Sequence, residues 1–253
     1  MHKNITLQPD ERLDEVNEHL TLIQRKNGLT FGTDAFLLSA FCRGKGKGRI
    51  ADLGCGTGII ALLLAARRRY AQIFGVEIQA VFAELARRNT ALNGFADTLP
   101  ILRADVRALS PADFGGELDA VVCNPPYMRA DTGFAAQHDE KQIARHEICG
   151  DIGDFTAAAA RCLRYGGSFY CVWRPDRLPA LFAAMAAAKL SPKRMVLVHD
   201  SPEKSPATVL IEARLGGAEG LSVLPPLFLH AASGANQPLT PRAQKIYDTG
   251  SFD

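Results

Sequence analysis

The stretch that decides the fold is Asp52-Leu53-Gly54-Cys55-Gly56-Thr57-Gly58, which ends a strand-like run over 49–53 and opens a helical run over 58–68. Its three glycines let the backbone turn tightly and pass close to a ligand, because glycine has no Cβ and adopts positive φ at little cost. A glycine-rich turn between a strand and a helix is typical of open parallel sheets that bind a ligand at the carboxyl ends of their strands. This turn therefore indicates both the fold class and the place of a ligand.

Strand-like and helical runs alternate along most of the remaining chain. Strand-like runs follow at 72–76, 98–103, 118–123 and 168–173. Helical runs lie at about 79–92, 152–163 and 178–188, and the second is expected to stop at Gly166-Gly167. This alternation predicts an α/β fold with a doubly wound, Rossmann-like and mostly parallel sheet. The runs 194–199 and 208–215 have no helix between them, which predicts an antiparallel C-terminal hairpin at the sheet edge.

The segment before residue 46 follows a different pattern. Two strand-like runs, 19–24 and 29–31, flank Arg25-Lys26-Asn27-Gly28, and Asn-Gly is a strong signal for a hairpin turn. A helix is expected over about 34–42, with Asp34 or Thr33 as its N-cap. We therefore expect an N-terminal extension over 1–45 with a small β-ribbon and a helix, followed by the main domain over 46–253.

Composition limits the class of protein. With 253 residues, of which 47% are hydrophobic and 22% charged, the chain is long enough for one soluble globular domain with a substantial core. The sequence has no apolar run of the ~18 residues that a transmembrane helix needs, and the N-terminus lacks the apolar stretch of a secretory signal. Six scattered cysteines form no Cys-x-x-Cys pair and no zinc-ligand spacing. We expect a cytoplasmic monomer with reduced cysteines, no membrane contact and no metal.

Positive charge is concentrated in three short segments, although the net charge is only +2. The segment 43–49 places four cations in seven residues, and Arg67-Arg68-Arg69 and Arg87-Arg88 close two helical runs. Cations at helix C-termini complement the helix dipole, so a solvated surface is one interpretation of the two arginine runs. Contact with nucleic-acid phosphates is the other, and neutralising Lys45 and Lys47 is then expected to weaken binding.

The glycine-rich turn admits two cofactor hypotheses. A dinucleotide fingerprint, Gly-x-Gly-x-x-Gly, would place its third glycine at position 59, but that residue is Ile59 and the glycine is Gly58. The carboxylate of Asp52, directly before the turn, would repel a pyrophosphate, whereas a zwitterionic amino acid tolerates it. Both features favour S-adenosylmethionine over NAD. Asp52, Gly54, Gly56 and Gly58 are therefore the first candidate cofactor residues.

Two further acids follow the ends of later strand-like runs. Glu77 lies 19 residues after Gly58 and ends the second run, a position suited to accepting hydrogen bonds from both ribose hydroxyls. Asp105 comes just after the third run, where it can meet the adenine amine of the cofactor. A helix N-cap or a solvated strand end is the alternative interpretation of each acid.

Asn124-Pro125-Pro126-Tyr127 directly follows the apolar run that ends at Cys123. Two prolines stiffen the backbone and remove two N–H donors, so the Asn124 side chain and the Pro125 carbonyl remain as acceptors. Two such acceptors can hold both N–H bonds of a conjugated exocyclic amine and aim its freed lone pair at a methyl donor. Tyr127 offers a ring on which a flipped planar base can stack. A rigid turn is the alternative interpretation, since Asn and Pro favour turns.

Longer motifs carry a resemblance to one family. The tetrapeptide at 124–127 is shared by adenine amine methyltransferases and by the protein glutamine methyltransferases that modify release factors. The segments 24–38, 203–212, Leu224-Pro225-Pro226-Leu227 and Lys245-Ile246-Tyr247 resemble those of the tRNA1(Val) adenine methyltransferases, a class I S-adenosylmethionine-dependent family. That family methylates the exocyclic amine of the adenine just 3′ of the anticodon. The resemblance spans nearly the whole chain and is weakest over 129–149.

The resemblance implies a tRNA substrate, a methyltransferase domain over 46–253 and roles for individual residues. It implies a cofactor site formed by Thr33, Asp52, Gly54, Gly56, Gly58, Glu77, Asp105 and Asn124. Asn124, Pro125 and Tyr127 would hold the target base, while Thr33 and Asp34 would lie over the cofactor pocket. The polar run 129–149, which contains Arg145 and His146, is expected to close over the target nucleotide. Two other hypotheses stay open: methylation of an rRNA base or a protein glutamine, and a non-catalytic RNA-binding module.

Overall fold

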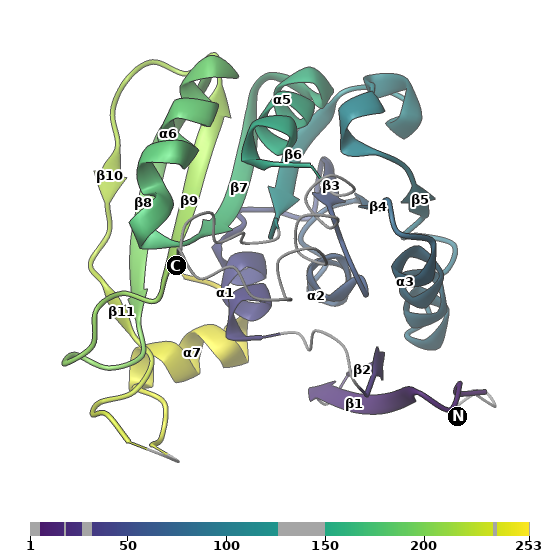
Figure 1. Cartoon of the computed structure of the whole chain (residues 1–253), viewed down its shortest axis with the longest axis horizontal. Helices are drawn as coiled ribbons and strands as arrows, with labels where there is room; N and C mark the ends of the chain where they lie inside the picture. Colours follow the sequence, from purple (N-terminus) through teal and green to yellow (C-terminus); the bar gives the residue numbers. More distant parts are fainter. Residues whose placement is uncertain (1–5, 18, 27–31, 126–149, 235–236, 253) are drawn as a thin grey trace, which may run out of the picture.

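A central mixed sheet organises the molecule (Figure 1). The computed structural model describes residues 6–17, 19–26, 32–125, 150–234 and 237–252. Within these residues the sheet has nine strands in the order β10-β8-β9-β7-β6-β3-β4-β5, with β11 paired to β8. The strands are β3 Arg49–Leu53, β4 Gln72–Glu77, β5 Ile101–Arg103, β6 Leu118–Cys123, β7 Leu163–Trp173, β8 Leu190–His199, β9 Thr208–Leu215, β10 Ser222–Val223 and β11 Leu227–Phe228.

Five neighbouring strands of this sheet run parallel. The first of them along the chain, β3, lies in the middle, with β4 and β5 added on one side and β6 and β7 on the other. The order of strands therefore reverses between β3 and β6, which is the topological switch point of a doubly wound sheet. The predicted Rossmann-like parallel core is confirmed.

The C-terminal hairpin is also confirmed. β9 is antiparallel to both of its neighbours, β7 and β8, and it has the predicted bounds of 208–215. β8 begins at Leu190, earlier than the expected residue 194, and continues to His199. Beyond β8 the sheet ends in the short strands β10 and β11, which both pair with β8 in parallel, so the hairpin does not itself form the sheet edge.

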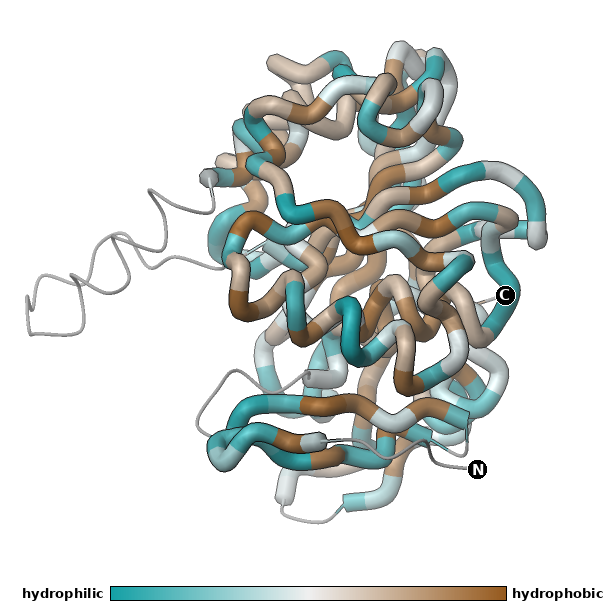
Figure 2. The backbone as a smooth tube through the Cα atoms, turned by 90° about the vertical axis from the view of Figure 1, so that its right-hand side faces the viewer, coloured by the Kyte–Doolittle hydropathy of each residue, from teal (hydrophilic) through white to brown (hydrophobic). Residues whose placement is uncertain are grey.

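Helices cover both faces of the sheet. They are α1 Thr33–Phe41, α2 Ile59–Ala66, α3 Ala80–Leu92, α5 Ile152–Cys162, α6 Leu178–Ala187 and α7 Pro241–Thr249. Alternate residues of β6 show the two layers, because Val121 and Cys123 pack with α5 and α6, whereas Ala120 and Val122 pack with the layer of α1, α2, α3 and α7. In Figure 1, α5 and α6 lie toward the top and the other helices toward the bottom. Figure 2 shows the strands crossing the interior as hydrophobic segments.

A two-stranded N-terminal ribbon lies apart from this sheet, at the bottom of Figure 1. The predicted ribbon is confirmed, but its observed pairing joins β2 Leu20–Arg25 to β1 Glu11–Asn17, a strand that was not expected. The side chain of Asn17 makes the turn, because its Oδ1 accepts hydrogen bonds from the N–H groups of His19 and Leu20 at 2.9 and 3.0 Å. The expected turn at Asn27-Gly28 and the strand over 29–31 lie outside the described residues.

The residues expected to cap helix α1 and to end helix α5 are not the ones that do so. Helix α1 begins at Thr33, and its N-cap is Gly32 without a side-chain cap hydrogen bond, so neither Thr33 nor Asp34 caps it. Helix α5 spans Ile152–Cys162, close to the predicted 152–163, but Gly166-Gly167 is not what ends it, since Leu163 already begins β7. Leu163 pairs with Leu118, whereas Ala120, two residues further along β6, pairs with Ser168, so the double glycine lies in a β-bulge. Gly166 has a φ of +74°, which suits this kink.

Helix α1 packs against α2, α7 and the strands β7 and β9, so it belongs to the helical layer over the sheet. The division of the chain near residue 45 stays a prediction. Among the described helices, none combines the length and the apolar character needed to cross a membrane. Five cysteines within the described ranges are buried and carry free thiols: Cys42, Cys55, Cys123, Cys162 and Cys171.

Candidate active site

The two loops singled out in the sequence meet at the switch point of the sheet. Leu53, the last residue of β3, pairs with Cys123, the last residue of β6. The glycine-rich turn therefore begins at Gly54 directly beside Asn124, because paired residues of neighbouring strands lie about 5 Å apart. Ligands of open α/β sheets bind at this position, outside the carboxyl ends of the strands.

The glycine-rich turn is held in shape by backbone hydrogen bonds. The N–H groups of Gly54 and Cys55 both donate to the carbonyl oxygen of Val76 in β4, at 2.8 and 2.9 Å. Gly54 has a φ of +72°, and a Cβ there would lie 3.2 Å from the buried ring of Phe155. Gly56 has a φ of +56°, but a Cβ there would meet nothing within 4 Å. The turn is thus packed against Phe155 at Gly54, whereas the space beside Gly56 holds no protein atom within 4 Å of a Cβ.

The carboxylate of Glu77 supports this turn from the end of β4. It is buried, and its two oxygens accept hydrogen bonds from the backbone N–H groups of Gly56 and Gln79 at 3.0 and 2.8 Å. Burial raises the pKa of Glu77, while these N–H donors act in the opposite direction. Each carboxylate oxygen keeps a second lone pair, so Glu77 can still accept hydrogen bonds from a ligand.

Asp52 is the most unusual acid of the site. Its side chain is almost fully buried, and Oδ2 accepts a long hydrogen bond of 3.3 Å from the N–H of Ala61 in α2. Within the described residues, Oδ1 is buried without a hydrogen-bond partner. Burial, aided by the nearby charge of Glu77, raises the pKa of Asp52 to about 7. A buried acceptor without a donor points to a missing partner at the site.

Asp105 lies past the end of β5, where Arg103 pairs with Glu77. Its side chain caps the short 3-10 helix Val106–Ala108 by accepting from the N–H of Arg107 at 2.9 Å. The same carboxylate forms an ion pair of 2.7 Å with the Arg107 guanidinium, and this hydrogen-bonded contact lowers the pKa of Asp105. The helix-cap interpretation is therefore correct for Asp105, and its contact with a cofactor adenine stays a prediction.

The tetrapeptide at 124–127 is described in part. Asn124 is half-buried and Pro125 is buried, directly after the end of β6. Pro126 and Tyr127 lie outside the described residues, as does the segment 129–149 with Arg145 and His146.

Thr33 and Asp34 lie at the same edge of the sheet, but on its β7–β9 side. Asp34 accepts a hydrogen bond of 3.1 Å from Thr208 at the start of β9, close to the carboxyl end of β7. Burial raises the pKa of Asp34. Thr33 shares a hydrogen bond with Tyr247 of α7. Both side chains thus have protein partners, and their place over a cofactor stays a prediction.

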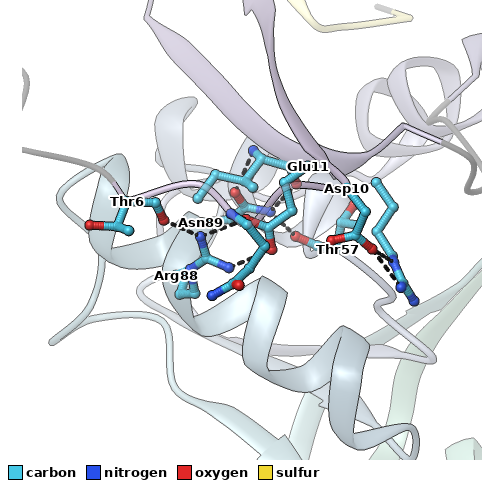
Figure 3. A network of polar contacts seen from close by, with 9 residues as sticks. Thr6, Asp10, Glu11, Thr57, Arg88 and Asn89 are labelled. Carbon is cyan, nitrogen blue, oxygen red and sulfur yellow. Dashed lines mark hydrogen bonds and ion pairs between the residues drawn. The ribbon is translucent and has the colours of Figure 1, made fainter.

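One residue of the site was missed in the sequence. Asn89 of α3 is fully buried, and its side-chain Nδ2 donates to the carbonyl oxygen of Thr57 in the glycine-rich turn at 2.9 Å (Figure 3). The signal was a polar residue three positions after Ala86, on the apolar side of an otherwise amphipathic helix. In the sequence, the cationic pair Arg87-Arg88 directly before Asn89 is the more conspicuous feature of this helix.

The fold and the site together define a methyltransferase with a Rossmann-like core. The family model of the methyltransferase small domain matches residues 25–186, a span that contains the glycine-rich turn, Glu77, Asp105 and Asn124.

Similar proteins identify the family within this class. A tRNA1(Val) (adenine(37)-N6)-methyltransferase of Porphyromonas gingivalis is 31% identical over 229 residues, which cover 87% of this chain and 89% of the relative. The protein of the same name in Dyadobacter fermentans is 28% identical over 221 residues, or 86% of this chain and 89% of that relative. The chain belongs to the family of the tRNA1(Val) (adenine(37)-N6)-methyltransferases. A solved structure, a predicted O-methyltransferase of Agrobacterium tumefaciens, matches with a TM-score of 0.69 at 24% identity over 87% of this chain and 97% of that one, which supports the fold.

Proposed function

We propose that this methyltransferase uses S-adenosylmethionine to methylate the N6 amine of an adenine in tRNA, at position 37 beside the anticodon. The observation that carries the proposal is the pairing of Leu53 with Cys123, which places the glycine-rich turn beside Asn124 at the switch point. The names of the relatives support tRNA and adenine as the substrate.

The residues of the site fit S-adenosylmethionine. The unpartnered Oδ1 of Asp52 suits the ammonium group of the amino-acid portion, and the open space at Gly56 suits close passage of a ligand past the backbone. Glu77, with lone pairs to spare, would accept hydrogen bonds from the ribose hydroxyls. Asp105 would need to share its carboxylate between Arg107 and the adenine amine. When bound, S-adenosylmethionine supplies an electrophilic methyl group.

Asn124 and Pro125 would hold the target amine. The amide oxygen of Asn124 and the carbonyl oxygen of Pro125 are both acceptors, so each can take one N–H of the adenine amine. Held in this way, the nitrogen moves toward tetrahedral geometry and its lone pair leaves conjugation with the ring. The same two oxygens stabilise the positive charge that grows on the nitrogen, and the proton it then loses passes to water. Tyr127 would stack on the flipped base.

The test is methylation of bulk tRNA with labelled S-adenosylmethionine, followed by nuclease digestion and mass spectrometry of the nucleosides. We expect N6-methyladenosine with the wild-type chain. With Asn124→Ala we expect at least a hundredfold slower transfer at unchanged cofactor affinity, about the effect of losing one group that positions and stabilises the reacting atoms.

Three outcomes would overturn the proposal. The mechanism is wrong if Asn124→Ala methylates tRNA at the wild-type rate. The substrate is wrong if label enters purified release factor or ribosomal RNA but not tRNA. A chain that binds tRNA without transferring a methyl group would instead point to an RNA-binding module.

A further inference from the structure

Helix α3 presents two asparagines, one turn apart, to the free edge of the N-terminal ribbon. Asn93 accepts from the N–H of Thr21 at 3.0 Å and donates to its carbonyl oxygen at 2.7 Å. Asn89 does the same with Ile23, at 2.7 and 3.1 Å. Thr21 and Ile23 are alternate residues of β2, whose N–H and C=O groups point away from β1. Each amide therefore acts as a strand partner would, and together they fix the ribbon to α3.

The two asparagines differ in one contact. The second hydrogen bond from Nδ2 of Asn93 returns to its own helix, at the carbonyl oxygen of Asn89, over 2.8 Å. The second hydrogen bond from Nδ2 of Asn89 leaves the helix and reaches the carbonyl oxygen of Thr57 over 2.9 Å. Figure 3 shows Asn89 between the ribbon and Thr57, with the ion pair of Arg88 and Glu11 alongside. Asn89 alone of the pair thus touches the glycine-rich turn.

The contacted carbonyl lies at the most adaptable part of this turn. Thr57 stands between Gly56 and Gly58, which both have positive φ. The carbonyl of Thr57 and the N–H of Gly58 belong to one planar peptide unit, and that N–H donates to the carbonyl oxygen of Cys55 at 2.8 Å. Two residues earlier, the N–H of Gly56 donates a hydrogen bond to the carboxylate of Glu77. Asn89 therefore fixes the last peptide of the turn from the side opposite Cys55, where two glycines would otherwise permit other orientations.

We propose that Asn89 is a positioning residue of the cofactor site. Through Asn89, the N-terminal ribbon helps to keep the glycine-rich turn in the conformation that binds the cofactor. This inference rests on the proposed use of S-adenosylmethionine. In the absence of cofactor, Asn89 keeps the turn in one conformation, so binding does not have to order it. Its loss weakens cofactor binding, whereas loss of Asn93 affects only how firmly the ribbon is attached.

The experiment compares Asn89→Ala with Asn93→Ala in the full chain. The dissociation constant for S-adenosylmethionine is measured by calorimetry, and the free energy of unfolding by urea titration. We expect Asn89→Ala to raise the dissociation constant about tenfold, equivalent to ~1.4 kcal/mol. Asn93→Ala, which removes a matched pair of ribbon contacts, should lower stability and leave the dissociation constant within about twofold of wild type.

Asn89→Asp provides a variant of unchanged shape if Asn89→Ala does not fold. It keeps an oxygen for the N–H of Ile23 but replaces the amide donor that faces Thr57, so it should also raise the dissociation constant while Asn93→Ala does not. The inference fails if the Asn89 variants bind the cofactor like wild type, or if Asn93→Ala weakens binding equally. Failure of the wild-type chain to bind S-adenosylmethionine at all would instead overturn the proposed function.

Discussion

The backbone N–H of Gly46 donates to the carbonyl oxygen of Arg69 over 2.9 Å and joins the two most basic segments of the chain, 43–49 and 67–69. These segments lead into β3 and β4, so they lie at the amino edge of the parallel strands, opposite the edge that carries Asn124. Lys45, Lys47 and Arg68 are exposed there, and within the described residues the structure records no ion-pair partner for them. Segments that are separate in the sequence thus form one surface, the amino-edge basic surface.

This surface should contribute to tRNA affinity without affecting the chemical step. We expect Lys45→Ala with Lys47→Ala to raise the KM for tRNA about tenfold near 0.1 M salt, because two phosphate contacts are lost. The value of kcat should not change, since the surface lies at the opposite edge of the sheet from Asn124. The logarithmic salt dependence of binding should become shallower by about two, while the charge-preserving pair Lys45→Arg with Lys47→Arg should behave like wild type. An unchanged KM in the alanine pair would show that RNA does not reach this surface.

Asp52 should make stability depend on pH. Its pKa in the folded chain, about 7, lies above the ordinary value of 3.8, so its contribution to stability is fully present below about pH 4 and is lost as the pH rises through 7. In urea titrations of the ligand-free chain, the free energy of unfolding of Asp52→Asn minus that of wild type should therefore increase by on the order of 2 kcal/mol from pH 5 to pH 8.

The matched control for Asp52 is Asp105→Asn. The pKa of Asp105 is lowered by Arg107, so this group is charged in both the folded and the unfolded chain throughout that range. The difference in stability between Asp105→Asn and wild type should therefore stay constant from pH 5 to pH 8. A constant difference for Asp52→Asn as well would mean that Asp52 is solvated in the ligand-free chain.

The two glycines at the start of the turn should respond differently to alanine. Both substitutions place a Cβ at positive φ, which costs about 1 kcal/mol. Gly54→Ala should cost about 1 kcal/mol more, because its Cβ also presses on the buried ring of Phe155. Gly56→Ala should lose only the ~1 kcal/mol that positive φ costs, but it should bind S-adenosylmethionine more weakly, since its Cβ projects into open space. Urea titration and calorimetry of both variants test this contrast, and the reverse order of effects would contradict it.

The ion pair of Arg194 and Glu212 should be a strong determinant of stability. Both groups are buried, and Arg194 also donates to the carbonyl oxygen of Phe41 at 2.7 Å. We expect Arg194→Ala to lower the free energy of unfolding by about 3–5 kcal/mol, because it leaves the buried Glu212 carboxylate with only the distant guanidinium of Arg214, at 3.9 Å, as an ion-pair partner. Arg194→Met combined with Glu212→Leu should lose less than Arg194→Ala does alone. Equal losses in urea titration would show that the carboxylate is not the source of the cost.

Local sequence patterns were sufficient for the parallel core. Of its strands, β3 and β6 have the predicted bounds, because their short apolar runs are closed sharply by Gly54 and Asn124-Pro125. The antiparallel strand β9 also has the predicted bounds. The placement of Glu77 and Asn124 at the carboxyl ends of their strands follows from the same pattern and is confirmed. Their roles toward a ligand stay predictions.

Several features that the sequence did not predict depend on side chains that form hydrogen bonds with backbone groups, in the place of other backbone groups. Asn17 makes the ribbon turn and Asn89 links three segments, and neither contact has a periodic signal. Asp105 fits both a cap and a ligand by spacing alone, and only its neighbour Arg107 decides the cap. The double glycine at 166–167 resembles a helix stop, but strand pairing with Leu118 begins before it and places it in a bulge.

The hydrogen bond between Arg194 and Phe41 joins residues that are 153 positions apart in the chain. During synthesis it can form only after all of the residues between them have been made. Helix α1 is made before β9 and α7, yet it packs against both. Until these emerge from the ribosome, the outer edge of β7 has no strand partner and α1 is covered only by α2 and β7. Such late, non-local closure slows folding and prolongs the exposure of surfaces that aggregate. Between the synthesis of β7 and that of β9, the growing chain therefore carries an unpaired strand edge that can aggregate.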